Sequence, residues 1–221
     1  MKHLNRFLEV HILSPILKAQ ELDASFVELK KGKLVSCVIP PFWVKKVARD
    51  LKDQEMLLSA AIAFPFGFQD TASKVHEAKE AIEQGVNEID FVWSQTAYHS
   101  GMNWPKIEIA QLSKLCHASE VTLKVILEIA HLNSNQLIEA CQICQDAGAD
   151  FVKTSTGYGG TGASVGQIEI MRNILSSSVG IIASGSFITL DETLALIQAG
   201  ADRVASTNAL AILQEWQQLQ S

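Results

Sequence analysis

The feature that most constrains this chain is a series of eight short apolar runs, rich in β-branched residues, at nearly regular intervals. The runs begin near Leu8, Leu34, Leu57, Glu88, Thr122, Phe151, Gly180 and Arg203, so successive starts lie 23 to 34 residues apart. Such spacing is typical of repeated strand–helix units. Runs that are apolar almost throughout suit parallel strands buried on both faces. Eight such units predict a TIM (β/α)8 barrel, an α/β fold that occupies residues 1–221 as a single domain.

Helix signals fill the intervals between the runs. Residues 71–84 and 134–147 each carry apolar side chains at helical spacing and are followed by a glycine. Thr189 and Glu192 have the spacing of a capping box. An open doubly wound sheet is the alternative arrangement, and it would favour a glycine-rich loop after the first strand. That position holds residues 14–16, Ser-Pro-Ile, which contain no glycine.

Composition narrows the class of protein. Of the 221 residues, 48% are hydrophobic and 19% are charged, which suits a large core and excludes a disordered chain. A net charge of −6 with scattered lysines and arginines argues against nucleic-acid binding. No window reaches the roughly 18 apolar residues of a membrane span, and the first residues make a poor signal peptide. The four cysteines are therefore predicted to be reduced thiols of a cytoplasmic protein, with Cys141 and Cys144 buried on an apolar helix face.

Polar residues inside the predicted strands are the candidates for chemistry. Asp90, Lys124, Glu128 and Lys153 interrupt three successive apolar runs. Side chains alternate in direction along a strand, so Lys124 and Glu128 are expected on the inner face together, and Lys153 also points inward. Catalytic groups of a barrel lie near the C-terminal ends of its strands, where these residues would converge. The alternative for Asp90, Lys124 and Glu128 is a structural ion-pair network.

Lys153 points most directly to a reaction. A buried lysine costs several kcal/mol unless it is paired or neutral. A lysine kept neutral by burial or by a neighbouring cation is a nucleophile that forms Schiff bases with carbonyl compounds. Lys124 is the predicted neighbouring cation, and Asp90 is the predicted proton-exchange partner.

Three loops could bind phosphate. Residues 154–162, Thr-Ser-Thr-Gly-Tyr-Gly-Gly-Thr-Gly, follow the sixth run and contain four glycines, whose backbone N–H groups could hold an anion. Residues 183–186 and 205–208 follow the seventh and eighth runs, where barrels often bind phosphate. A loop without a ligand is the alternative for the first of these. The histidines show no ligand-like spacing, so no metal is predicted.

These segments together resemble the bacterial type of deoxyribose-phosphate aldolase over roughly residues 36–210. The most specific match is Phe151-Val-Lys-Thr-Ser-Thr-Gly157, which is similar to the segment that carries the Schiff-base lysine of that family. The match continues through residues 162–165, and the segments 35–40, 63–67, 77–82, 88–90 and 123–128 also agree.

The resemblance implies a class I aldolase of the cytoplasm, a lyase of deoxyribonucleotide catabolism and carbohydrate metabolism that needs no metal or other cofactor. Such enzymes reversibly cleave 2-deoxyribose 5-phosphate to glyceraldehyde 3-phosphate and acetaldehyde. By motif matching, Lys153 would form the imine, Asp90 would transfer protons through water, and Lys124 would line the site. Substrate and phosphate contacts would come from Thr156, Gly157, Gly185, Ser186, Thr207 and Asn208. A small aldehyde or sugar phosphate is the expected partner, without nucleic acid or membrane, and the chain is compatible with a homodimer.

The sequence also departs from the family pattern. The position of a second active-site lysine in the seventh strand is Ile182, and that of a phosphate-site arginine is Ile188. The usual aspartate and threonine of the first strand are missing around Val10-His11-Ile12. Three functions therefore stay open: an aldolase with reduced activity, an aldolase with an altered substrate, and a non-catalytic relative that binds a phosphorylated metabolite or acts as a regulatory subunit.

Overall fold

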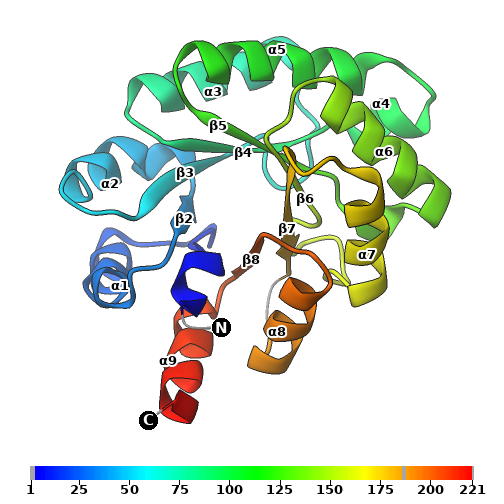
Figure 1. The fold of residues 1–221 in the computed structure, drawn as a ribbon. Helices are drawn as coiled ribbons and strands as arrows, with labels where there is room; N and C mark the ends of the chain where they lie inside the picture. Colours follow the sequence, from blue (N-terminus) through cyan, green and yellow to red (C-terminus); the bar gives the residue numbers. More distant parts are fainter. Residues whose placement is uncertain (1–2, 186–187, 221) are drawn as a thin grey trace.

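The protein, described by a computed structural model over residues 3–185 and 188–220, is a closed barrel of eight parallel strands. Each strand pairs with its neighbours in sequence, and the last strand pairs with the first through Leu8 beside Val204 and Val10 beside Ser206. Figure 1 looks along the barrel, with the strands around the centre and the helices outside them. The predicted TIM-barrel fold class is confirmed, and the open-sheet alternative is wrong.

The strands coincide with the eight predicted runs but are shorter. They are β1 (Leu8–His11), β2 (Ser36–Ile39), β3 (Leu57–Ile62), β4 (Glu88–Val92), β5 (Thr122–Ile126), β6 (Phe151–Lys153), β7 (Gly180–Ser184) and β8 (Arg203–Ser206). The helices are α1 (Ala19–Gly32), α2 (Val44–Asp50), α3 (Thr71–Glu83), α4 (Gln95–His99), α5 (Trp104–Ala118), α6 (Ser134–Asp146), α7 (Val165–Ile174), α8 (Leu190–Gln198) and α9 (Ala209–Gln220).

Local sequence signals account for several helix boundaries. The predicted capping box forms at the start of α8, where the Thr189 side chain accepts a hydrogen bond from the Glu192 backbone and Glu192 bonds back to Thr189. Helices α3 and α6 begin as predicted and end one residue earlier. Cys141 and Cys144 are buried free thiols on the core side of α6, so their predicted burial is confirmed.

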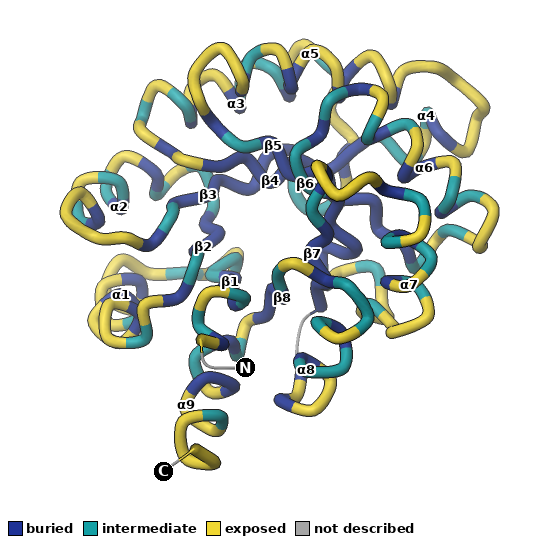
Figure 2. Tube along the Cα trace, viewed as in Figure 1, coloured by how far each residue is buried: buried dark blue, intermediate teal, exposed yellow. Residues whose placement is uncertain are grey.

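The apolar core is the layer between the barrel and its helices. Side chains such as Val125, Val152 and Ile181 point outward from adjacent strands into this layer. Figure 2 shows buried strands at the centre and exposed turns on the outer sides of the helices. Within the barrel, the alternate strand positions include several charged side chains, where branched apolar residues are the usual filling.

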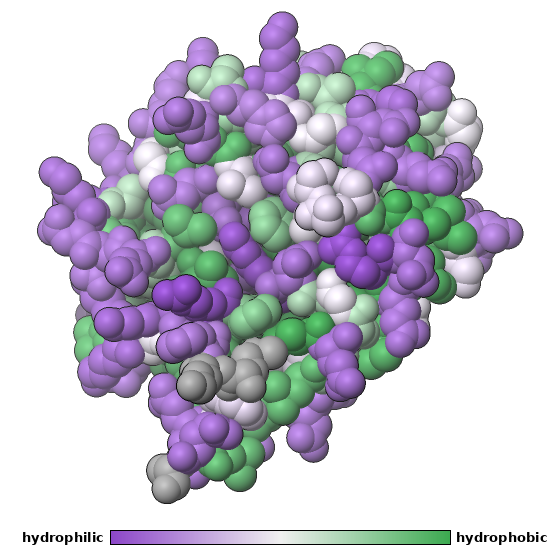
Figure 3. All heavy atoms as spheres, viewed as in Figure 1, coloured by the Kyte–Doolittle hydropathy of each residue, from purple (hydrophilic) through white to green (hydrophobic). Residues whose placement is uncertain are grey.

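The outer surface fits this layered arrangement. Figure 3 shows hydrophilic side chains projecting around the rim of the viewed face, with hydrophobic ones interspersed between them. None of the helices within the described ranges has the length and apolar composition needed to cross a bilayer.

Candidate active site

Six charged side chains from five strands form one connected group inside the barrel, which we call the interior cluster. It comprises the carboxylates Glu9, Glu88 and Asp90 and the cations Lys124, Lys153 and Arg203. The five members other than Arg203 are at most 1% exposed. Three negative charges therefore face three positive charges, which offsets the cost of removing each ion from water.

Asp90 lies between the two lysines of the cluster. One of its carboxylate oxygens binds the Lys153 ammonium group, and the other lies 2.7 Å from Lys124 Nζ. Ser59 Oγ donates a further hydrogen bond of 2.8 Å to Asp90. Adjacent strands bring these residues together, since Asp90 pairs in register with Lys124 and Ile126 pairs with Lys153. The side chains of β4, β5 and β6 thus converge as the sequence predicted.

Glu9 is the second carboxylate beside Lys153. Its Oε2 atom lies 3.3 Å from Lys153 Nζ, and its Oε1 atom lies 3.2 Å from Lys124 and 2.9 Å from Arg203. Arg203 also reaches Glu88 at 2.7 Å, and Ser36 donates a hydrogen bond of 2.7 Å to Glu88.

Glu9, Asp90 and Lys124 keep their charges because the opposite charges around them outweigh the effect of burial on their pKa values. Burial acts to raise the pKa of Asp90, but Lys124 and Lys153 outweigh it and the pKa is lowered. The pKa of Glu9 is likewise held well below its usual range by Lys124, Lys153 and Arg203, against the effect of burial. For Lys124, burial acts in the lowering direction, yet Asp90, Glu88 and Glu9 raise its pKa. Lys124 is therefore a permanent cation beside the Lys153 amine.

A cavity of about 410 Å³ opens at the C-terminal ends of the strands. It is lined by His11, Ile12, Leu13, Ser14, Phe64, Thr156, Gly157, Tyr158 and Thr207. These residues follow or end β1, β3, β6 and β8, so the cavity lies at the end of the barrel where catalytic groups are expected. His11 connects the cavity to the interior cluster, because one of its ring nitrogens lies within 4.8 Å of carboxylate oxygens of both Glu9 and Asp90.

Glu9, His11 and Asp90 together could in principle offer ligands to a metal ion, although the histidine spacing had predicted no metal. Both carboxylates are already ion-paired, Glu9 and Asp90 each with Lys124 and Lys153. A metal ion at this position would stand beside the same two ammonium groups. The donor set therefore favours an amine-centred site over a metal centre.

Comparison with known proteins places this chain in a family. The family model described as DeoC/LacD family aldolase matches residues 14–211. The chain belongs to the DeoC/LacD aldolase family. It is 37% identical to a deoxyribose-phosphate aldolase of Lactiplantibacillus plantarum over 95% of this chain and 98% of the relative. It is 35% identical to a deoxyribose-phosphate aldolase of Treponema denticola, with the same coverage.

A solved structure supports the same assignment. The aldolase QR15 superimposes with a TM-score of 0.93 at 27% identity, covering 100% of this chain and 98% of that chain. The family membership favours an aldolase over the non-catalytic alternative that the departures at Ile182 and Ile188 had left open.

Within this aldolase, the predicted phosphate-binding residues do not form one group. Thr156, Gly157 and Thr207 line the cavity beside His11. Gly185 instead lines a separate space of about 460 Å³ with Gly160, Gly162, Ala163 and Ile188. Asn208 binds the Ile188 backbone, accepting its N–H at 3.2 Å and donating to its carbonyl at 2.8 Å, so its amide is already engaged within the fold. Ser186 lies outside the described residues.

Glu128 corrects one prediction. Strand β5 ends at Ile126, and Glu128 has the left-handed backbone angle φ of 53°, so it does not continue the inner face of Lys124. Its carboxylate instead accepts hydrogen bonds from the backbone and hydroxyl of Thr156, and it fills the space in front of Gly159. The aldolase thus places a carboxylate of its own against the glycine-rich loop that was predicted to hold phosphate.

Sequence reasoning missed Glu9, Glu88, His11 and Arg203. A signal for three of them was present, because Glu9 and His11 alternate along β1, and Glu88 lies two residues before Asp90 on β4. Arg203 gave a weaker signal. It is the first residue of β8, and the sequence was equally consistent with its belonging to the preceding loop. Ile182, the expected departure, is fully buried and pairs in register with both Lys153 and Arg203.

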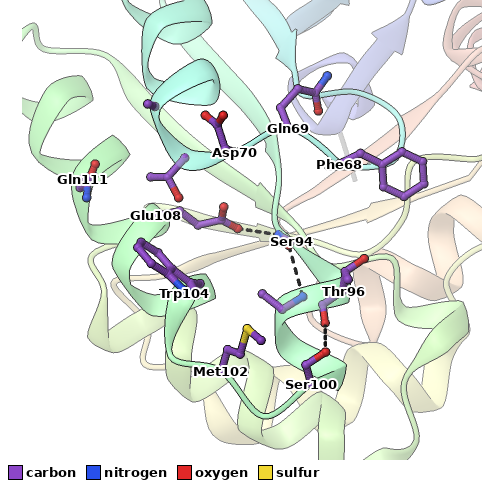
Figure 4. A pocket seen from close by; sticks show the side chains of 13 residues that line it. Phe68, Gln69, Asp70, Ser94, Thr96, Ser100, Met102, Trp104, Glu108 and Gln111 are labelled. Carbon is purple, nitrogen blue, oxygen red and sulfur yellow. Dashed lines mark hydrogen bonds between the residues drawn. The ribbon is translucent and has the colours of Figure 1, made fainter.

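A second large cavity lies outside the barrel. Figure 4 shows this space of about 640 Å³, with Phe68, Met102 and Trp104 around it and Glu108 at its inner side. Glu108 is ion-paired with the buried Lys74 at 2.9 Å. None of the lining residues belongs to the interior cluster, so this cavity is separate from the candidate active site.

Proposed function

We propose that this protein is a class I aldolase in which Lys153 forms an imine with an aldehyde, and that it cleaves 2-deoxyribose 5-phosphate to glyceraldehyde 3-phosphate and acetaldehyde. The names of the related enzymes support the substrate. The observation that carries the mechanism is a fully buried lysine, bonded to Asp90 and lying beside Glu9 and the cavity residue His11. A cytoplasmic location and a homodimer are part of the proposal.

The proposed sequence begins with proton transfer. Asp90 binds the Lys153 amine directly and is the group placed to take a proton from it. The amine then adds to C1 of the open-chain sugar, and Asp90 returns the proton to the C1 hydroxyl, which leaves as water to give the iminium ion. Asp90, acting through water, then takes the C3 hydroxyl proton as the C2–C3 bond breaks, and glyceraldehyde 3-phosphate is released. The same proton passes back to C2 of the remaining enamine, and addition of water to the resulting iminium ion releases acetaldehyde and regenerates the lysine.

Lys124 supports this sequence as a fixed cation. It lies 2.7 Å from Asp90, and its position favours the charged form of that carboxylate. In the proposal, the charge of Lys124 makes the ionised form of Asp90 the favoured one, so Asp90 readily passes on each proton that it takes. Ile182 adds an apolar wall beside Lys153 and supplies no proton-transfer group, so the proposal includes slower turnover than a second lysine would support.

The substrate phosphate is proposed to bind at the C-terminal ends of β6, β7 and β8. The backbone of Gly157 and the hydroxyl of Thr207 are the candidate contacts on the side of the cavity beside His11, and Gly185 and Ser186 are the candidates from the loop after β7. Thr156 is a candidate whose hydroxyl would exchange Glu128 for the phosphate, and Asn208 is a candidate through the loop that it holds. Because Ile188 stands where the family pattern has an arginine, phosphate is expected to contribute less to substrate affinity than a charged pair would.

Borohydride trapping tests the imine. The protein is incubated with acetaldehyde, reduced, digested and mapped by mass spectrometry; the expected product is an ethyl group on Lys153. Lys153→Met should lose both the adduct and the cleavage of 2-deoxyribose 5-phosphate. Lys114→Met, which removes an exposed lysine of α5, is the matched control and should keep both. Cleavage of 2-deoxyribose 5-phosphate that survives in Lys153→Met, or no adduct on Lys153 in the wild type, would overturn the proposal.

A further inference from the structure

His11 is the one histidine whose ring enters the proposed active site, among those the structure describes. It is the last residue of β1 and is 7% exposed. It lines the cavity of about 410 Å³ at the end of the barrel. Its Nε2 atom is buried and has no hydrogen-bond partner in the described part of the chain. An unpaired buried polar atom costs free energy, so its retention at a cavity indicates a group that arrives with the substrate.

The surroundings of His11 define what that group can be. Glu9 and Asp90 place carboxylate oxygens within 4.8 Å of one of its ring nitrogens, but both carboxylates are already paired with Lys124 and Lys153, so the compensated charges around the ring favour a neutral polar group over an ionic one. Burial, followed by the charge of Lys153, lowers the pKa of His11 to about 3, so the ring is neutral near pH 7. A neutral imidazole has one donor and one acceptor nitrogen. A hydroxyl group both donates and accepts, so it can pair with Nε2 in either tautomer.

We infer that His11 is a substrate-binding residue whose Nε2 atom pairs with a hydroxyl group of the substrate held at Lys153. This inference rests on the proposed aldolase function and extends it, because it assigns a hydroxyl subsite to β1. The first strand thus contributes both a carboxylate to the interior cluster, through Glu9, and a specificity contact to the cavity, through His11.

The test compares a substrate that carries hydroxyl groups with one that has none. In His11→Phe, which keeps a planar ring and removes both nitrogens, acetaldehyde should still be trapped on Lys153 at a rate within about threefold of the wild type. The value of kcat/KM for cleavage of 2-deoxyribose 5-phosphate should fall about 10- to 100-fold, the usual consequence of a lost hydrogen bond that leaves its partner unpaired.

Three further variants separate binding from structure. His11→Gln can place its amide nitrogen near the position of Nε2 and should recover most of the lost kcat/KM. His11→Leu should behave as His11→Phe does, and it serves if the larger ring disturbs folding. His99→Phe, which changes an exposed histidine of α4, is the matched control and should leave both readouts unchanged.

The possible outcomes distinguish this inference from the proposed function. If trapping and cleavage fall together in His11→Phe and His11→Leu, the role of His11 is structural and the inference is wrong. It is also wrong if neither readout changes. Absence of any adduct in the wild-type protein would instead contradict the proposed function, whatever the His11 variants do.

Discussion

At the scale of single residues, the candidate site is governed by compensation between buried charges. Asp90 accepts from Lys153, Lys124 and Ser59 at once, and both lysines keep its carboxylate ionised. A buried ion pair adds little net stability, but removing one partner leaves an uncompensated charge. Substitutions in the cluster therefore test electrostatics more than packing.

His11 gives the residue-scale prediction for pH. Its pKa is lowered from 6.5 to about 3 by burial and by Lys153, so between these values the unfolded chain binds a proton that the folded chain does not. Stability linked to His11 is therefore complete above about pH 6.5 and is lost as pH falls, by at most about 1.4 kcal/mol per pH unit. Urea unfolding of the wild type at pH 7.5 and 5 should show this loss.

The control for that prediction is His11→Phe, whose free energy of unfolding should change less between pH 7.5 and 5. Glu9 and Asp90, whose pKa values are lowered, add a separate loss of stability only below the carboxylate range of the unfolded chain, near pH 4. Equal pH slopes in the wild type and the variant would contradict the buried neutral histidine.

At the scale of elements, the loop after β6 is held by a carboxylate from the loop that follows β5. Glu128 binds Thr156 twice, and an ideal Cβ atom on Gly159 would lie 2.4 Å from Glu128 Cδ. Position 159 thus requires glycine, because the Glu128 side chain occupies the space that a Cβ atom would need. This contact joins two neighbouring β–α loops and holds the wall of the cavity at Gly157 and Tyr158.

Gly159→Ala should therefore displace the Glu128 carboxylate and shift the loop. We expect kcat/KM for 2-deoxyribose 5-phosphate to fall about 10- to 100-fold, as for other misplacements of roughly an ångström near a reacting group. Steady-state kinetics measure the effect. Gly166→Ala in α7 is the control, because nothing lies within 4 Å of its added Cβ atom, and its activity should match the wild type.

The packing of α3 against α5 depends on a second buried ion pair. Lys74 and Glu108 are fully buried, with 2.9 Å between Nζ and Oε2, and Lys74 also donates to the Val92 carbonyl. Burial lowers the pKa of Lys74 and raises that of Glu108, so each ion depends on the other to stay charged.

Lys74→Met should lower the free energy of unfolding by about 3–5 kcal/mol, because it leaves Glu108 buried without its partner. The double variant Lys74→Met/Glu108→Leu should recover much of that loss, since neither ion remains. Denaturant unfolding measures both. Lys79→Met removes a lysine of α3 whose side chain is 59% exposed, and it should cost no more than about 1 kcal/mol.

At the scale of the whole molecule, the barrel interior balances three carboxylates against three cations drawn from β1, β4, β5, β6 and β8. Arg203 spans this group, since it binds Glu9 of the adjacent strand β1 and Glu88 of β4, which is not a neighbour of β8. Ile182 lies beside both Lys153 and Arg203 in register. The charge of a side chain on one strand therefore limits which charged side chains the neighbouring strands can hold in the barrel interior.

A double-mutant cycle at these two positions should reveal the balance. Arg203→Met leaves an excess negative charge and Ile182→Lys adds an excess positive one, and each should lower the free energy of unfolding by several kcal/mol. Together they restore three charges of each sign, so the double variant should be more stable than the sum of the single effects predicts, by at least about 1 kcal/mol. Additive losses in thermal unfolding would contradict a shared interior charge balance.

Much of the barrel could be predicted from the chain alone. Eight apolar runs at near-regular spacing indicated the eight strands, because parallel strands buried on both faces need such runs. Asp90, Lys124 and Lys153 were recognisable as charged residues inside those runs. Local patterns also predicted the start of α8 and the burial of Cys141 and Cys144.

The partners of those residues were decided by closure of the barrel. Glu9 and Lys153 are 144 positions apart in sequence, and only the pairing of β1 with β8 closes the ring that brings them within 3.3 Å. The prediction for Glu128 was wrong because it assumed that the alternation of side chains continues past Ile126. Strand β5 ends there, and Glu128 itself has a left-handed backbone conformation. Periodicity thus determined which residues face inward, whereas contacts across the barrel depend on strand register and closure, which no local pattern encodes.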